Sequence, residues 1–177
     1  MDFFMRYWKS VISLFLCITL GACAPAPGAF VLRSALLDAG TLTVSSDWRP
    51  DAQVLDALDH GIELPFVVTL SAQRSGFAST QIRRHVQLRY FPLSRQYQLR
   101  DVEDASTRNY AARALALTAM ENLRLPLPGF DAAGATRLRV RIALDRDELP
   151  GALRLPAVLR SAWHMDSGDY AWLTRAG

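Results

Sequence analysis

Apolar and polar residues alternate along much of the chain after residue 30, and this period of two predicts β-strands. The alternation is clearest over residues 136–144, where Leu138, Val140 and Ile142 are separated by arginines. Successive side chains of a strand point to opposite faces, so the apolar residues share one face and the arginines share the other. The same pattern predicts strands over residues 30–37, 41–48, 64–71, 81–90 and 96–102.

Turn-forming residues lie between several of these strands. The segment Asp38-Ala39-Gly40 suits a turn, and Pro92–Arg95 is expected to close a hairpin. Pro65 lacks a backbone N–H, which predicts that its strand begins at a sheet edge or a bulge. Residues 161–173 are aromatic around Asp166-Ser167-Gly168 and predict a last hairpin.

Two segments are expected to be helical. Residues 50–61 begin with proline, carry apolar residues on one side and end at glycine, which predicts a short helix. The alanine-rich residues 107–123 predict a longer helix, and residues 150–156 are interpreted as a crossing bounded by prolines. The fold class is therefore α+β, mostly antiparallel β in a sandwich-like or curved sheet, with one short and one longer helix. Residues 30–177 are predicted to form a single β-rich domain.

The first 22 residues have the features of a bacterial signal peptide. Arg6 and Lys9 give a positive start, and residues 11–22 form an apolar run. This run is too short to cross a hydrocarbon core, which takes about 20 residues. The segment Leu20-Gly21-Ala22-Cys23 resembles the bacterial lipobox, in which the cysteine sulfur receives a diacylglyceryl group. We therefore predict that Cys23 is lipidated and that residues 23–29 form a Pro-rich tether.

Ordinary cleavage is the alternative to lipidation. The segment Ala22-Cys23-Ala24 fits a small-x-small site, but Pro25 would then directly follow the cut. Proline disfavours that position because it has no N–H and a fixed φ. Bacterial lipoproteins usually carry three acyl chains, enough for firm anchoring. Ala24, rather than Asp, follows the cysteine, and the resemblance to sorted lipoproteins implies the outer membrane over the inner, with the domain facing the periplasm.

Composition and charge narrow the function classes. Half of the residues are hydrophobic and 21% are charged, as in globular proteins. Without the leader, 18 arginines, no lysine and 16 acidic residues remain, a net charge of +2. This excess is too small to predict nucleic-acid binding. A GC-rich genome explains the all-arginine set more simply than a selected phosphate site does. With Cys17 removed and Cys23 acylated, neither a disulfide nor a thiolate metal ligand is expected.

Several ordered stretches resemble a proteobacterial exported family, that of domain of unknown function 4390 (DUF4390). They lie within residues 55–64, 88–97, 125–127, 139–156 and 163–172, and they include Leu88-Arg89-Tyr90-Phe91-Pro92-Leu93-Ser94-Arg95-Gln96-Tyr97. The resemblance implies envelope localisation, a mixed β-rich domain and no assigned catalytic residues. It also implies a gene neighbour that encodes a membrane sensor histidine kinase. The lipobox departs from family members that have an ordinary signal peptide.

The arginines of residues 136–144 are the most suggestive candidate site. If the strand from Gln81 lies beside them, its own basic residues extend the row. The candidate anion- or lipid-binding face then comprises Arg83, His85, Arg89, Arg137, Arg139 and Arg141. Such a face could hold phosphates of lipid headgroups or lipopolysaccharide through forked contacts. The alternative is a solvated sheet face whose arginines pair with acidic residues on neighbouring strands.

The sequence gives little support for a hydrolase triad or a metal site. His164, Asp166, Ser167 and Asp169 contain the residue types of a hydrolase triad, but adjacent Asp, Ser and Gly favour a turn. The histidines, His60, His85 and His164, are far apart in the sequence, and no metal-ligand spacing occurs, so neither a metal site nor a cofactor is expected.

We expect a non-enzymatic, membrane-tethered interaction domain, and accessory action on a neighbouring sensor kinase is one version of it. Binding of anionic lipid or lipopolysaccharide is the second hypothesis, and an unrecognised hydrolase is the third.

Overall fold

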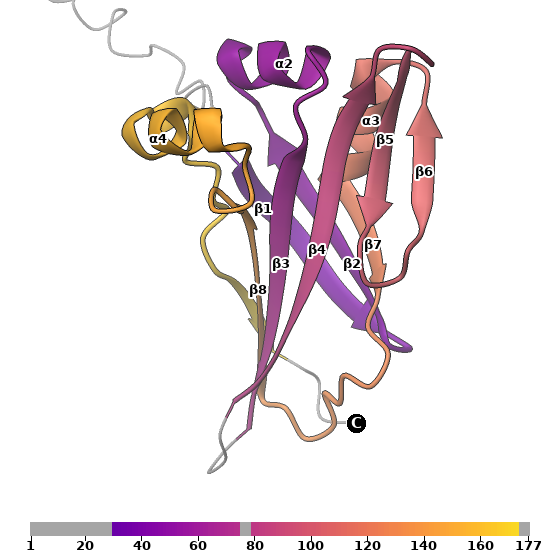
Figure 1. Ribbon diagram of the computed structural model, residues 1–177. Coiled ribbons are helices and arrows are strands. Elements are labelled where there is room, and N and C mark those ends of the chain that lie inside the picture. Colours follow the sequence, from indigo (N-terminus) through magenta and orange to yellow (C-terminus); the bar gives the residue numbers. More distant parts are fainter. Residues whose placement is uncertain (1–29, 75–78, 174–177) are drawn as a thin grey trace, which may run out of the picture.

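The computed structural model describes residues 30–74 and 79–173, which form two antiparallel sheets (Figure 1). The predicted signal peptide over residues 1–22, Cys23 and the tether over residues 23–29 lie outside the described residues. The smaller sheet has the order β1-β2-β7, made of β1 (Phe30–Asp38), β2 (Thr41–Trp48) and β7 (Asn122–Pro126). The larger sheet has the order β6-β5-β4-β3-β8-β9, made of β3 (Leu64–Gln73), β4 (Thr80–Phe91), β5 (Gln96–Asp101), β6 (Thr107–Tyr110), β8 (Arg137–Leu144) and β9 (Tyr170–Leu173). The predicted α+β class with mostly antiparallel strands is confirmed.

The described residues contain three α-helices and one 3-10 turn. They are α2 (Ala52–Asp59), α3 (Arg113–Glu121), α4 (Gly151–Leu159) and η1 (Ser161–Trp163). Helix α2 lies within the predicted short helix, and the Asp51 carboxylate caps it by accepting the backbone N–H of Gln53 at 2.9 Å. None of the helices in the described ranges is long and apolar enough to cross a membrane.

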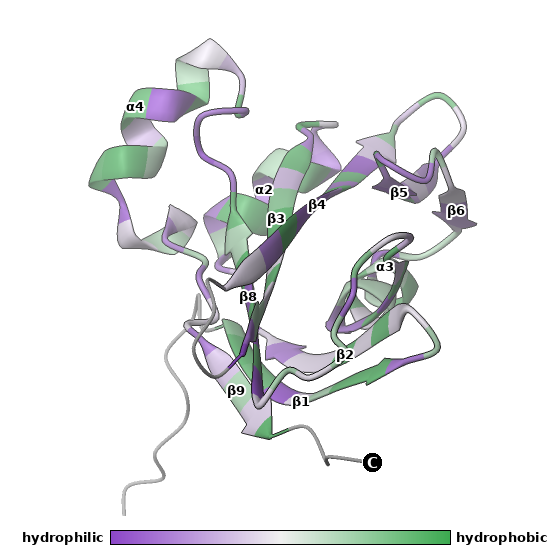
Figure 2. Ribbon diagram, turned by 90° about the horizontal axis from the view of Figure 1, so that it is seen from below, coloured by the Kyte–Doolittle hydropathy of each residue, from purple (hydrophilic) through white to green (hydrophobic). Residues whose placement is uncertain are grey.

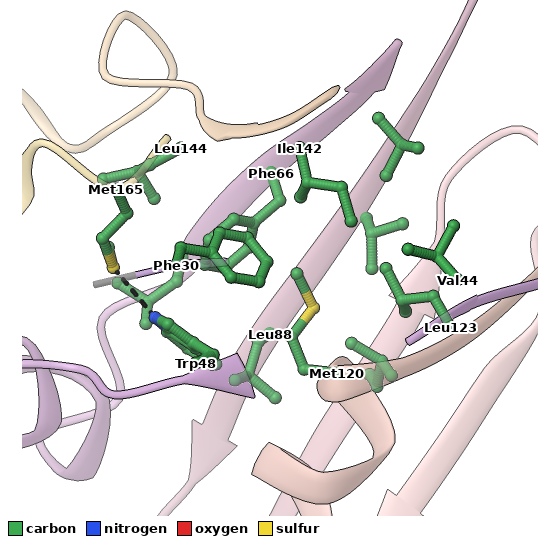
Figure 3. Close-up of a cluster of buried hydrophobic side chains, with 14 of the residues drawn as sticks. Phe30, Val44, Trp48, Phe66, Leu88, Met120, Leu123, Ile142, Leu144 and Met165 are labelled. Carbon is green, nitrogen blue, oxygen red and sulfur yellow. Dashed lines mark hydrogen bonds between the residues drawn. The ribbon is translucent and has the colours of Figure 1, made fainter. Parts of the chain in front are cut away.

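The hydrophobic core lies between the two sheets. Phe30 and Trp48 of the smaller sheet meet Phe66 of β3, with ring centroids 5.3–6.1 Å apart. Met120 of α3 and Leu88 of β4 are fully buried in the same cluster (Figure 3). Figure 2 shows the larger sheet curving toward the smaller one, with α3 in the space between them. Helix α3 contacts both β2 and β5, so it closes the side on which the sheets diverge.

Three expectations for the second half of the chain are wrong. Residues 107–110 form β6, paired with β5, so the longer helix is reduced to the nine residues of α3. Residues 151–159 are helical rather than an extended crossing. Pro156 is tolerated in α4 because the carbonyl that loses its donor belongs to the exposed Ala152. Residues 161–173 do not pair with one another: β9 pairs with β8 instead.

Pro65 lies in a central strand, rather than at the edge or bulge that it predicts. The two backbone polar groups of a residue in an antiparallel ladder point to the same side. The Pro65 carbonyl accepts the N–H of Asp145 at 2.8 Å, so its missing N–H faces that side too. Strand β8 ends one residue earlier, at Leu144, and therefore no ladder bond is lost there.

Candidate anion-binding face

The outward side of β4, β3 and β8 carries most of the basic residues that the sequence singles out. Strand β3 separates the other two, so the assumption that β4 lies beside β8 is wrong. The register instead places Arg83 and Arg141 on either side of Thr69, and Arg139 beside Ser71. Neighbouring strands lie about 4.8 Å apart, which puts the backbones of Arg83 and Arg141 about 10 Å apart. We call these five residues the arginine face.

A shallow hollow of about 340 Å³ lies on the arginine face. The short hydroxyl side chains of Thr69 and Ser71 line it from β3, and longer arginine side chains line it from both flanking strands. A small residue between two long ones leaves a depression, so the shape follows directly from the residue types that the register brings together. The remaining lining residues are Ser79, Gln81, Val140 and Asp169.

The arginines of this face differ in their partners. The Nε of Arg141 donates to Oδ1 of Asp166 at 2.8 Å, and its Nη2 contacts Oδ2. These hydrogen bonds raise the pKa of Arg141 and lower the pKa of Asp166. Arg83 and Arg139 are exposed and form no ion pair or hydrogen bond with any residue that the structure describes. The solvated-face alternative, in which acidic residues neutralise the arginines, therefore describes Arg141 but not the other two.

Two of the predicted basic residues lie away from the hollow. Arg137 is opposite Gln73, at the far end of the β3–β8 pairing, and has no ionic partner within the described ranges. Arg89 lies beyond the other end of β3, where Nη1 is 4.0 Å from Glu63 and the guanidinium stacks on Phe91. Arg89 is thus not part of a continuous basic patch.

His85 is on the same outward side but is held by a carboxylate. Its Nδ1 contacts Glu103 Oε1, and its backbone N–H donates to Glu103 Oε2 at 2.9 Å. Burial acts to raise the pKa of Glu103, but the hydrogen bonds from His85 outweigh it and leave that pKa lowered. Glu103 lies just beyond Asp101, where β5 ends. Its carboxylate therefore accepts the backbone N–H of His85 in place of a β5 carbonyl. His85 therefore belongs to a paired site, not to a free basic patch.

The fold also brings together a set of donors that the sequence did not reveal. His85, Asp145 and Glu148 each place one donor atom within 4.8 Å of the others. Because Glu103 engages Nδ1, the Nε2 of His85 is the nitrogen left to bind a cation. One imidazole and two carboxylates suit a divalent transition metal. Sequence spacing could not find this set because only strand pairing brings residue 85 near residue 145.

The triad-like residues near the C-terminus have structural partners. Ser167 Oγ accepts the backbone N–H of Ile142 at 2.9 Å and donates to the Gly168 carbonyl. His164 Nε2 lies 3.0 Å from the Val158 carbonyl. With Asp166 bound to Arg141, no hydrogen bond links the Ser, His and Asp in the part of the chain that the structure describes. The arrangement fits the turn interpretation.

The family model of a domain of unknown function, DUF4390, matches residues 35–173. The chain belongs to the DUF4390 family. The match runs from within β1 to the end of β9, so both sheets and every helix described above are part of the DUF4390 domain. No curated protein and no solved structure matches the chain. The resemblance recognised from the ordered sequence stretches is confirmed.

Proposed function

We propose that this DUF4390 protein is a lipid-anchored, non-enzymatic domain of the cell envelope that binds a phosphate-bearing ligand on its arginine face. The observation that carries the proposal is the pair of exposed guanidinium groups of Arg83 and Arg139 beside one hollow, which have no ionic or hydrogen-bonding partner among the described residues. A guanidinium offers paired N–H donors that match phosphate oxygens. The hydroxyls of Thr69 and Ser71 add donors between them.

Arg141 contributes differently from the two free arginines. Its contact with Asp166 holds the side chain in place and partly offsets its charge. It therefore supports a site of fixed shape, while Arg83 and Arg139 supply most of the uncompensated charge. Binding rather than catalysis is supported because the Ser, His and Asp groups near the C-terminus are taken up by structural contacts.

The envelope part of the proposal is supported by the predicted leader and lipobox, and phosphate-bearing lipids are abundant in the envelope. Anionic phospholipid and lipopolysaccharide share the phosphate that the arginine face would recognise. An arginine near an anionic lipid surface contributes about 1 kcal/mol, so reversing both free arginines should weaken binding about 30-fold or more. A protein partner such as the neighbouring sensor kinase remains a prediction from the family resemblance.

The test uses the unacylated mature chain, in which Cys23→Ser removes the anchor. Vesicle binding then measures the arginine face without a contribution from the lipid. Co-sedimentation is measured with phosphatidylglycerol vesicles, with phosphatidylcholine vesicles and with lipopolysaccharide, each with and without inorganic pyrophosphate. The variant R83E/R139E is compared with R108E/R124E, a matched double reversal of exposed arginines on β6 and β7, away from the arginine face.

We expect binding to one of the anionic lipids, and we expect pyrophosphate to compete with it. R83E/R139E should weaken this binding about 30-fold or more, whereas R108E/R124E should retain it. Binding to only one of the two anionic lipids would identify the phosphate source. Equal losses in both charge variants would mean non-specific attraction and would overturn the proposal, as would an absence of binding to either anionic lipid.

A further inference from the structure

Helix α4 presents an apolar face to solvent. Leu155, Val158 and Leu159 are 68%, 56% and 74% exposed. Their spacing of three and four residues places them on one side of the helix, one above the other. Exposed leucines occur singly on most proteins, but three large apolar side chains on one nine-residue helix form a contiguous patch.

The opposite side of α4 is also apolar. Ala157 is fully buried, and Leu153 packs against the core. A surface helix normally turns a polar face to water, whereas a helix that is apolar on both sides is covered on both. The residues that the structure describes cover one side of α4 and leave the other side uncovered.

The position of α4 in the fold indicates what contacts its exposed apolar side. Arg160, which follows α4, donates from Nη1 to Gln53 Oε1 of α2 at 3.0 Å, so the two helices lie at the same end of the molecule. Helix α2 follows β2, whose last residue, Trp48, is paired with Phe30. Strand β1 therefore starts at the end of the domain that carries α2 and α4 (Figure 1).

The chain length before β1 then limits where this end can lie. Seven residue steps separate Cys23 from Phe30, and they span at most about 25 Å when fully extended. We propose that α4 is a membrane-contacting helix, whose apolar face lies in the interface of the bilayer that holds the Cys23 lipid. This inference rests on the anchor in the proposed function, but it does not depend on the arginine face.

Other groups at the end of the domain that carries α2 and α4 also suit contact with a membrane. Arg154 and Arg160 flank the apolar face of α4 and are both exposed, as expected for cations that meet anionic headgroups. The β4–β5 turn packs against the end of α2, since a Cβ at Gly61 would lie 3.3 Å from the Tyr90 carbonyl oxygen. Leu93 at the tip of that turn is fully exposed and adds a second apolar point.

The experiment uses the complete acylated protein in vesicles of phosphatidylethanolamine and phosphatidylglycerol. Acylation of Cys23 and loss of Cys17 with the leader leave no native thiol, so one introduced cysteine can carry an environment-sensitive fluorophore. The label is placed at L159C and, as a matched control, at L36C. Leu36 is a 60% exposed leucine of β1, about 20 Å along the strand from Phe30 toward the opposite end. Flotation of the protein with the vesicles reports the anchor separately.

We expect a quencher attached to the acyl chains to reduce emission from L159C several-fold more than from L36C, with the reverse order for aqueous iodide. Equal quenching at the two sites in protein that floats would overturn the α4 contact while leaving the anchor intact. A second outcome would also overturn it: protection of L159C from iodide that increases with the density of protein on the vesicles, without quenching by the acyl-chain quencher. A second copy of the protein would then cover α4. Protein that fails to float would remove the anchor and this inference together.

Discussion

The indole Nε1 of Trp48 lies 3.3 Å from the sulfur of Met165, and this contact joins the two sheets (Figure 3). Trp48 ends β2 of the smaller sheet, whereas the Met165 carbonyl accepts the N–H of Leu144 at the end of β8. Both side chains are almost completely buried. The thioether is thus the acceptor for a buried indole N–H.

Replacement of Met165 by leucine should therefore cost more than replacement of a methionine that only fills space. Met120 is fully buried and supplies the matched control. A volume-conserving swap costs less than about 1.5 kcal/mol, while an unsatisfied buried N–H adds about 1–3 kcal/mol. Chemical denaturation should show M165L to be less stable than M120L by about 1 kcal/mol or more. Equal stabilities would mean that the sulfur does not act as an acceptor.

The buried pair Arg84 and Asp101 should respond very differently to single and double substitution. Arg84 Nη2 lies 2.7–2.8 Å from both Asp101 oxygens, with the two side chains only 5% and 7% exposed. D101A leaves the buried Arg84 guanidinium without its hydrogen-bonded partner, with only Glu103 Oε2 at 3.6 Å from its Nε. The substitution should therefore cost about 3–5 kcal/mol. The apolar double variant R84M/D101L should recover most of that loss, measured by urea unfolding.

The exposed pair of Arg33 and Asp47 provides the control for this prediction. Their side chains are 61% and 25% exposed, and solvent screens such a pair, so D47A should be far milder than D101A. A D101A variant as mild as D47A would show that water reaches Arg84.

The contact between Arg141 and Asp166 should make stability depend on pH in a defined window. The hydrogen bond from Arg141 lowers the pKa of Asp166 below its ordinary value of 3.8. A depressed carboxyl pKa contributes stability above the ordinary value, and the contribution is lost as the pH falls through the lowered pKa. Both side chains are more than one third exposed, so the effect is at most about 1 kcal/mol.

Thermal unfolding should accordingly show D166N to be less stable than the wild type at pH 7. The difference should shrink as the pH falls below 3.8 and be lost once the pH is below the lowered pKa of Asp166. R141Q removes the same contact and should give the same pH profile. A loss in D166N that R141Q does not share would assign it to the Asp166 contact with the Gly168 N–H instead. A difference that stays constant down to acid pH would contradict the prediction.

Substitution of Cys23 tests the anchor directly. We expect radiolabelled palmitate to enter the wild-type protein and not C23A, because the sulfur is the acceptor in the lipobox reaction. The wild type should fractionate with membranes, and C23A should be recovered without label. Label on C23A, or none on the wild type, would contradict lipidation.

Local patterns predicted more of this fold than of its site. The period-two alternation placed β2 at its observed bounds, and it assigned the β8 arginines to the outward face because side-chain direction depends only on position within the strand. Helix propensity was less reliable: residues 107–110 belong to β6 because pairing with β5 outweighs their helical preference. Likewise, Pro156 suggested a break, but α4 tolerates it at an exposed carbonyl.

By itself, the sequence determined which residues share a face, which family the chain resembles and which cysteine is the candidate for the anchor, because each is a matter of spacing along the chain. Tertiary structure alone decided that β3 lies between β4 and β8 and that Thr69 separates Arg83 from Arg141. It likewise decided that Asp166 pairs with Arg141, while Arg83 and Arg139 have no partner in residues 30–74 and 79–173. It also decided that α4 turns an apolar side outward. The physical reason is that strand order and burial depend on contacts between segments far apart in the chain, and no local period records them.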